Sequence, residues 1–339
     1  MDDLHFCGPT STNCRWNKRS VIGIIGGQGE MGRLFSNFFS SHGFHVNVAD
    51  LGTALTPEQA VRESDIVIFA VPLHKTVEII RQLVPYTRRG QLLMDLTSLK
   101  TAPVQEMLQS PACVVGLHPM FGGRISSFIG QTLAACPVRI GQAQWRKLRA
   151  LFTSSGIRVK ECSPEEHDRM MGIIQVLFHL TTMLIGRTLR KLDVDIDETL
   201  NYTSPSYRIE MNLVGRIFAQ SPELYAAITQ MNPNTKEILS ALQDGLEVYE
   251  QFYSSGNLKG FMEDFERSAR HLGDFCSDAY RESSQILDFS VNLANHKRNS
   301  SGERGDGDEA TRGRGDAVRA RRGDAGTGGD GDEATRGKA

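Results

Sequence analysis

The sequence predicts an α/β protein, in which a doubly wound parallel sheet is followed by an all-α domain. Between residues 20 and 163, short apolar runs alternate with amphipathic stretches, a pattern typical of parallel strands joined by helices. Beyond residue 163 the strand pattern stops, and helical spacing continues to about residue 296. We therefore expect an N-terminal extension (1–19), a sheet domain (20–163), a helical domain (164–296) and a C-terminal tail (297–339).

The candidate strands of the sheet domain are Val21–Ile25, Phe44–Ala49, Ile66–Val71, Leu92–Leu96, Val114–Leu117, Thr132–Val138 and Ile157–Lys160. The first intervening helix is expected at Met31–Ser40, where four apolar side chains recur on one face. Another helix should begin after Thr56, because Thr-Pro-Glu-Gln is a capping box with proline at the first helical position.

Helix starts in the second domain are marked by Ser-Pro pairs. Ser163, followed by Pro-Glu-Glu, is a capping box that opens a long helix, whose apolar positions run from Met170 toward Leu192. Ser204 and Ser221 stand before proline in the same way. Two further helices are expected over Thr235–Tyr253 and Leu258–Ser283.

Composition excludes several classes of protein. The chain has 339 residues, a formal net charge of −2 and no uninterrupted apolar run near the ~18 residues of a membrane span, so we expect neither nucleic-acid nor membrane binding. Met1–Ser20 lacks the apolar core of a signal peptide, and the six cysteines show no metal-ligand spacing. We expect a cytoplasmic enzyme without a metal. The last 40 residues are rich in glycine and charge and should be a disordered low-complexity tail.

A glycine-rich turn lies directly after the first candidate strand. Gly27, Gln28, Gly29, Met31 and Gly32 belong to a G-x-G-x-x-G that opens a helix. The glycines permit a tight turn and a close approach to a pyrophosphate, which the helix N-terminus favours. This context predicts a Rossmann-type dinucleotide-binding domain.

An acidic residue selects the dinucleotide. Asp50 ends the second strand, where it would accept the ribose hydroxyls and repel a 2′-phosphate, so NAD is the expected cofactor. Val71, at the end of the third strand, is a further expected cofactor contact.

Candidate reacting residues follow two other strands. His118 comes after Val114–Leu117, in a loop with Pro119 and a glycine pair, at the sheet edge where such folds bind ligands. A histidine is suited to general-base catalysis near neutral pH, although a structural role is equally compatible with the position. Ser98 and Lys100 follow Leu92–Leu96 and would offer a hydroxyl and a cation to the same crevice.

The helical domain supplies candidate substrate ligands. Arg208 and Arg216 lie eight residues apart on one helix, and Arg216 has apolar neighbours, so we expect it to be partly buried and to need an anion. A substrate carboxylate would bind it bidentately. His179 either lines the core or faces the substrate.

Several long motifs resemble the prephenate dehydrogenase family. They are GGQGEMGRLF (26–35), FAVPLHKT (69–76), DLTSLK (95–100), GLHPMFG (116–122), EEHDRMMGIIQVLFH (165–179) and SPSYRIEMNLVGRIFAQSPELYA (204–226). The likeness covers Val21 to Arg281 and is greatest to the dehydrogenase half of the bifunctional chorismate mutase/prephenate dehydrogenases.

The resemblance implies an NAD-dependent oxidative decarboxylation of a cyclohexadienyl acid, prephenate, as in tyrosine biosynthesis. His118 would accept the proton of the ring 4-hydroxyl, Ser98 would hydrogen-bond that hydroxyl and His118, and Arg216 would bind a substrate carboxylate. Lys100, His179 and Arg208 carry over less directly, as substrate-site or structural residues. A homodimer joined through the helical domain is also implied.

Other functions remain open. Gly123-Arg124 stands where the bifunctional relatives usually have Pro-Asp. Two other substrates therefore stay open: 4-amino-4-deoxyprephenate, a substrate of antibiotic pathways, and arogenate. A β-hydroxyacid or imine dehydrogenase would need a lysine on the helix from Glu165 to Arg190, which has none. A non-catalytic NAD sensor would need only the glycine loop.

Overall fold

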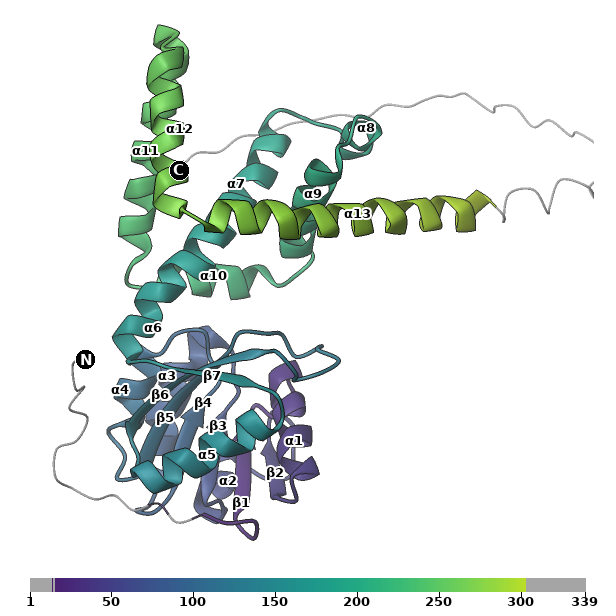
Figure 1. The fold of residues 1–339 in the computed structure, drawn as a ribbon. Coiled ribbons are helices and arrows are strands. Elements are labelled where there is room, and N and C mark those ends of the chain that lie inside the picture. Colours follow the sequence, from purple (N-terminus) through teal and green to yellow (C-terminus); the bar gives the residue numbers. More distant parts are fainter. Residues whose placement is uncertain (1–13, 15, 303–339) are drawn as a thin grey trace, which may run out of the picture. The chain divides into compact units, whose positions relative to one another are not determined.

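The computed structural model describes residue 14 and residues 16–302, with side chains up to residue 292 (Figure 1). The rest of the N-terminal extension and the tail from residue 303 lie outside these residues. The described residues through Tyr280 belong to one compact unit, and the described residues from Arg281 onward belong to a second. The first unit contains the sheet and the helices that follow it as far as Tyr280.

Seven strands form one sheet in the order β2-β1-β3-β4-β5-β6-β7. All neighbouring pairs are parallel except β5 and β6, which are antiparallel. The predicted α/β sheet is therefore confirmed, with one strand reversed. The strands are β1 (Val21–Ile25), β2 (His45–Ala49), β3 (Ile66–Phe69), β4 (Leu92–Asp95), β5 (Cys113–Pro119), β6 (Thr132–Arg139) and β7 (Arg158–Glu161).

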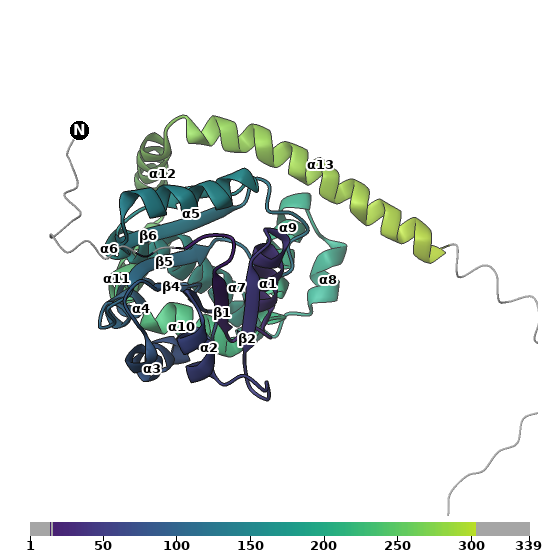
Figure 2. The same ribbon diagram turned by 90° about the horizontal axis from the view of Figure 1, so that it is seen from below.

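Helices cover both faces of the sheet (Figure 2). On one face, α1 (Glu30–Ser41) and α5 (Gln142–Ser154) bury an aromatic cluster that includes Phe39 and Phe152. On the other face lie α2 (Pro57–Glu63), α3 (Leu73–Leu83, followed by the 3-10 turn Val84–Tyr86) and α4 (Thr101–Met107). The capping box at Thr56 is present as predicted.

The remaining described elements are helical, as the sequence predicts. They are α6 (Pro164–Met171), the π-helical segment η2 (Gly172–Leu177), α7 (Phe178–Lys191), α8 (Ile196–Asn201), α9 (Pro205–Phe218), α10 (Pro222–Met231), α11 (Thr235–Ser255), α12 (Leu258–Leu272) and α13 (Phe275–Gly302). The hydroxyls of Ser163, Ser204 and Ser221 each accept a backbone N–H at a helix start, so these three starts are confirmed.

Two helix predictions are corrected. The helix expected over Leu258–Ser283 is two helices, α12 and α13, because Gly273 takes a positive φ of 60° that ends α12. The helix after Ser163 contains the π-helical turn η2. In addition, α13 extends to Gly302, beyond residue 297, where the composition predicts that the tail begins.

The continuous helical stretch Pro164–Lys191 is long and apolar enough to cross a membrane by length and composition alone. A single helix of this kind is weak evidence, because core helices of other proteins satisfy the same criterion. Much of its apolar surface is exposed in the chain: Ile173 and Ile174 are each 47% exposed.

A small apolar cluster joins the sheet layer to the helices that follow. Leu73 on α3 and Leu99, just before α4, pack against Ala227 and Ile228 on α10, and all four are at most 7% exposed. The end of the sheet that carries the candidate site is thereby held against the second set of helices.

Candidate active site

The glycine loop between β1 and α1 is shaped by contacts that exclude side chains. Gly26 adopts a positive φ of 81°. A Cβ on Gly32 would lie 2.4 Å from the carbonyl oxygen of Gly26, so only glycine permits this packing of α1 on the loop. No side chain caps α1, whose N-cap is Gly29, and its first N–H groups can therefore bind a phosphate.

Asp50 lies beside this loop. Its carboxylate accepts a hydrogen bond from the backbone N–H of Gln28 at 2.8 Å and another from Leu51 at 2.7 Å. The structure thus places the predicted ribose-binding acid directly against the predicted phosphate-binding turn. Met31 and Val71 are half-buried, and Val71 contacts the position of a Cβ on Gly26.

His118 is the residue before the last of β5, and it is paired with Ala134 of β6. The prediction of a loop position is wrong, since β6 extends the ladder through Pro119. The side chain is buried, and burial, together with the charge of the nearby Lys100, holds the pKa of His118 well below its usual value of 6.5. The ring is therefore neutral at pH 7 and can act as a base.

A chain of hydrogen bonds leads from His118 into α6. Its Nδ1 lies 2.9 Å from Nε2 of His167, and Nδ1 of His167 lies 2.8 Å from Oδ1 of Asp168. The Asp168 carboxylate also accepts the backbone N–H groups of Lys100 (2.8 Å) and Thr101 (2.9 Å) at the start of α4. Burial opposes ionisation of Asp168, but these hydrogen bonds prevail and lower its pKa.

The other ring nitrogen of His118 faces the π-helical segment. Its Nε2 lies 3.5 Å from Nε2 of Gln175, a half-buried side chain of η2. π-Helical turns occur frequently at functional sites. His118 is therefore held between α6 on one side and η2 on the other.

Lys100 does not offer its cation to the crevice, and that prediction is wrong. Its side chain is 0% exposed and forms an ion pair with Asp95, which is also 0% exposed. The ammonium group also donates to the carbonyl of Leu117 at 2.8 Å, directly before His118. Because the loop after β4 turns back on itself, the side chain of Lys100 reaches Asp95, the last residue of β4. In this structure Lys100 connects the carboxyl ends of β4 and β5.

Ser98 lies in the same loop and is half-buried. Among the described residues, its hydroxyl makes no side-chain hydrogen bond. The expected bond between Ser98 and His118 is therefore not formed in this structure. A role for the Ser98 hydroxyl toward a substrate remains a prediction.

A second group of predicted residues gathers on α7, α9 and α10. The rings of His179 and Tyr225 meet edge to face with centroids 4.9 Å apart. Nδ1 of His179 is buried without a hydrogen-bond partner among the described residues, and burial lowers the pKa of His179. Burial raises the pKa of Tyr225, while the charge of Arg216 opposes this effect, so these three residues are neighbours.

The expectation that Arg216 is partly buried is wrong for the chain described here, in which it is exposed. Met211, Val214 and Ile217 form the buried face of α9, and Arg216 lies beside that face. Arg208, two turns earlier, is half-buried. No hydrogen bond or ion pair among the described residues joins either guanidinium to the His118 group.

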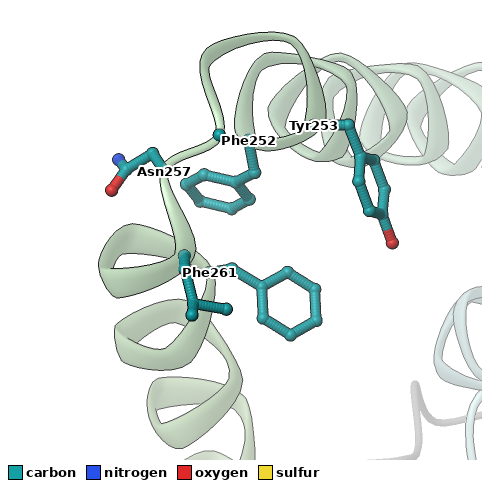
Figure 3. Close-up of a pocket in the computed structure, with 6 residues that line it drawn as sticks. Phe252, Tyr253, Asn257 and Phe261 are labelled. Atoms are coloured by element: carbon teal, nitrogen blue, oxygen red, sulfur yellow. The ribbon is translucent and has the colours of Figure 1, made fainter.

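Hollows lie on the helices of the second domain. One of about 400 Å³ is lined by residues of α7, α9 and α10, including Met183, Phe218 and Tyr225. Another of about 250 Å³ lies at the turn between α11 and α12, where the rings of Phe252 and Phe261 meet edge to face and Tyr253 also lines the hollow (Figure 3). The first adjoins the Tyr225 group; the second is wholly aromatic and apolar apart from Asn257.

Within the described part of the chain, no cluster of three histidine, cysteine or acidic side chains could hold a metal ion. Sequence reasoning missed His167, Asp168, Gln175 and Asp95 as members of the site. Three of them lie in the motif 165–179, and a histidine and an aspartate in the first turns of a capped helix were the available signal.

The fold and the site define an enzyme with a nucleotide-binding domain, in which the glycine loop and a buried, neutral histidine lie at one sheet edge. Two family profiles match the chain: "Prephenate dehydrogenase, nucleotide-binding domain" over residues 36–161, and "Prephenate dehydrogenase, dimerization domain" over residues 163–267.

Three relatives illustrate the similarity. A "Probable arogenate/prephenate dehydrogenase" of Methanocaldococcus jannaschii is 33% identical over 276 residues, 76% of this chain and 62% of the relative, so this chain spans less than two thirds of that protein. The "T-protein" of Haemophilus influenzae is 32% identical over 78% of this chain and 71% of its own. A "4-amino-4-deoxyprephenate dehydrogenase" of Streptomyces pristinaespiralis is 28% identical over 77% of this chain and 95% of its own.

Among solved structures, prephenate dehydrogenase from A. aeolicus in complex with hydroxyphenyl propionate and NAD⁺ shares the fold. The TM-score is 0.59 at 19% identity, covering 75% of this chain and 97% of that one. The chain belongs to the prephenate dehydrogenase family.

The buried Asp95–Lys100 pair makes a stability prediction. In Lys100→Met, the Asp95 carboxylate stays buried without its partner, which should lower the free energy of unfolding by about 3–5 kcal/mol. Asp95→Asn/Lys100→Met leaves neither charge of this buried pair and should be more stable than the single variant. Urea denaturation followed by circular dichroism measures both.

Lys259→Met, in an exposed ion pair with Glu263, is the matched control and should leave the free energy of unfolding nearly unchanged. If Lys100→Met were as stable as the wild type, the ion pair would not stabilise the ends of β4 and β5.

Proposed function

We propose that this protein catalyses the NAD-dependent oxidative decarboxylation of prephenate to 4-hydroxyphenylpyruvate. The observation that carries the proposal is the buried, neutral His118 at the carboxyl end of β5, in a chain of the prephenate dehydrogenase family. At neutral pH this ring is able to accept a proton from the substrate hydroxyl at C4.

The residues of the glycine loop fit a dinucleotide. The packing at Gly26 and Gly32 leaves the uncapped N-terminus of α1 available to a pyrophosphate, and Asp50 lies where an adenosine ribose would bind. A carboxylate at this position favours NAD over NADP because it repels a 2′-phosphate. When bound, the nicotinamide ring would accept the hydride from C4 of the substrate.

The chain's own residues would supply the proton acceptor and the contacts that bind the substrate. His118 would hold the proton from the C4 hydroxyl, with Ser98 as a second hydrogen-bond partner of that hydroxyl. Arg216, beside Tyr225, would bind a carboxylate of the substrate. Loss of the ring carboxylate as CO₂ then follows from aromatisation, without a further catalytic group.

The second candidate is 4-amino-4-deoxyprephenate, which would give 4-aminophenylpyruvate. Its support is the match to the Streptomyces enzyme of that name, which extends over 95% of the length of that protein. Arogenate is a third candidate, supported by the name of the archaeal relative. All three substrates carry a ring carboxylate and a hydroxyl or amino group at C4, and His118 would be the base for each of them.

A homodimer is the proposed assembly, through the helices that match the dimerization domain of the family. The exposed apolar side chains of these helices support it, among them Ile173, Ile174, Phe178, Leu184 and Phe218. A partner subunit that covers them would remove apolar surface from water, a favourable change in free energy.

The decisive assay compares substrates. NADH formation is measured with prephenate, 4-amino-4-deoxyprephenate and arogenate, and the three are ranked by kcat/KM, which reports differential transition-state binding. A preference for prephenate supports the main proposal, and a preference for the amine supports the second. NAD binding without turnover of any of the three would contradict the enzymatic proposal altogether.

His118→Asn should lower kcat by about 10²–10⁴-fold, because it removes the general base. Since burial lowers the pKa of His118, the ring protonates only when the pH falls well below 6.5. The wild-type kcat/KM should therefore stay constant from alkaline pH down to 6.5 and decline only at a pH well below 6.5. The variant should lack this decline. Isothermal titration with NAD is the control, and near wild-type turnover of the variant would exclude His118 as the base.

Arg216→Ala should raise KM more than it lowers kcat, because it removes a charge-assisted hydrogen bond to the substrate. Such bonds contribute about 1.5–3 kcal/mol, which corresponds to a roughly 10- to 100-fold rise in KM. Arg146→Ala, an exposed arginine of α5, is the matched control. An unchanged KM in Arg216→Ala would remove this residue from the substrate site.

A further inference from the structure

The protonation state of each nitrogen in the His118 chain follows from the acceptors along it. Asp168 has an ionised carboxylate that already accepts two backbone N–H groups, from Lys100 and Thr101. An ionised carboxylate only accepts hydrogen bonds, so Nδ1 of His167, at 2.8 Å, must carry the hydrogen between them.

In a neutral His167 the other nitrogen, Nε2, then has a lone pair and no hydrogen. It lies 2.9 Å from Nδ1 of His118, which must therefore carry the hydrogen of that bond. Neutral histidine has one hydrogen on its ring nitrogens, so Nε2 of His118 is left with its lone pair. That nitrogen faces Gln175, whose amide group is the donor available to it among the described residues.

We propose that Asp168 and His167 are positioning residues that hold the hydrogen of His118 on Nδ1 and so leave Nε2 as the base. The kinetic part of this inference rests on the proposed function; the assignment of the hydrogens does not. When Nε2 accepts a proton, the N–H at Nδ1 remains directed at His167 and, through it, at the Asp168 carboxylate. This arrangement stabilises the imidazolium, as the aspartate does in a Ser-His-Asp triad.

The arrangement also depends on the contact between the sheet and α6. His118 lies on β5, whereas His167 and Asp168 lie on α6, and Asp168 binds the first N–H groups of α4. The backbone carbonyl of Asp168 accepts a hydrogen bond from Asn232 at 2.9 Å, which fixes α6 from the other side. His118 therefore becomes a competent base only where α6 is docked on the sheet.

The first test is nitrogen NMR of the full-length protein labelled with ¹⁵N-histidine at pH 7.5, without substrate or NAD. The His118 signals are those lost in His118→Gln. We expect a pyrrole-type shift for Nδ1 and a pyridine-type shift for Nε2. A hydrogen on Nε2 overturns the proposal, because His167 would then be the donor. This outcome does not depend on which substrate the enzyme uses.

The second test is a pair of variants at His167. The side-chain oxygen of His167→Gln can still accept the hydrogen bond from His118, whereas His167→Leu keeps apolar packing but has no acceptor. We expect kcat to fall by about 10²-fold in the leucine variant and by less than about 10-fold in the glutamine variant, with KM within about threefold in both.

His45→Gln, an exposed histidine on β2, is the matched control and should leave kcat and KM unchanged. Equal losses of kcat in the two His167 variants would overturn the proposal, because packing alone would then explain them. If no prephenate-type acid is turned over by the wild type, the proposed function fails, and the NMR assignment still decides the positions of the hydrogens.

Discussion

The hydrogen bonds accepted by the Asp168 carboxylate are the constraint on which the site depends. Three donors converge on its two oxygens: two backbone N–H groups at the start of α4 and one ring N–H of His167. The carboxylate therefore caps one helix, orients a histidine on another and joins the sheet layer to the helical layer. Because the group is buried, each of these bonds is stronger than it would be in water, and the loss of any one is costly.

The buried ion pair of Asp95 and Lys100 is a second constraint on the carboxyl ends of β4 and β5, where His118 lies. Lys100 contributes its backbone N–H to Asp168 and its ammonium group to Asp95 and to the carbonyl of Leu117. One residue thus connects the carboxyl ends of β4 and β5 with α6. Its positive charge, together with burial, also lowers the pKa of His118. A fully buried lysine thus helps to keep the His118 ring neutral.

The fold could be predicted from the sequence because its signals are local. Strand and helix alternation, the glycine loop and the serine caps each depend on a few neighbouring residues. The members of the site that were missed depend on contacts across the fold. His167 and Asp168 lie 49 and 68 residues from His118 and Lys100, which they bind, and their place in the first turns of a capped helix does not say which groups they contact.

The two wrong burial predictions have the same origin. A lysine at a sheet edge and an arginine among apolar residues were assigned from their sequence neighbours alone. Lys100 is buried because Asp95, five residues earlier, is folded back beside it. Arg216 is exposed because Val214 and Ile217 already occupy the inward face of α9. Burial of a long charged side chain is set by its tertiary partner, which the local pattern does not contain.

The same reasoning bears on the departure at Gly123-Arg124. The guanidinium of Arg124 lies 2.6 Å from Glu30, the first residue of α1, and Gly123 packs so closely on Glu30 that a Cβ there would lie 2.6 Å from the Cβ of Glu30. The guanidinium of Arg124 therefore faces α1, the helix that follows the glycine loop, and the Glu30 carboxylate neutralises its charge there. Its effect should be on how the loop after β5 rests against α1. Among the described side chains, Gln175 lies much nearer to His118 than this ion pair does, since its amide nitrogen is 3.5 Å from Nε2 of His118.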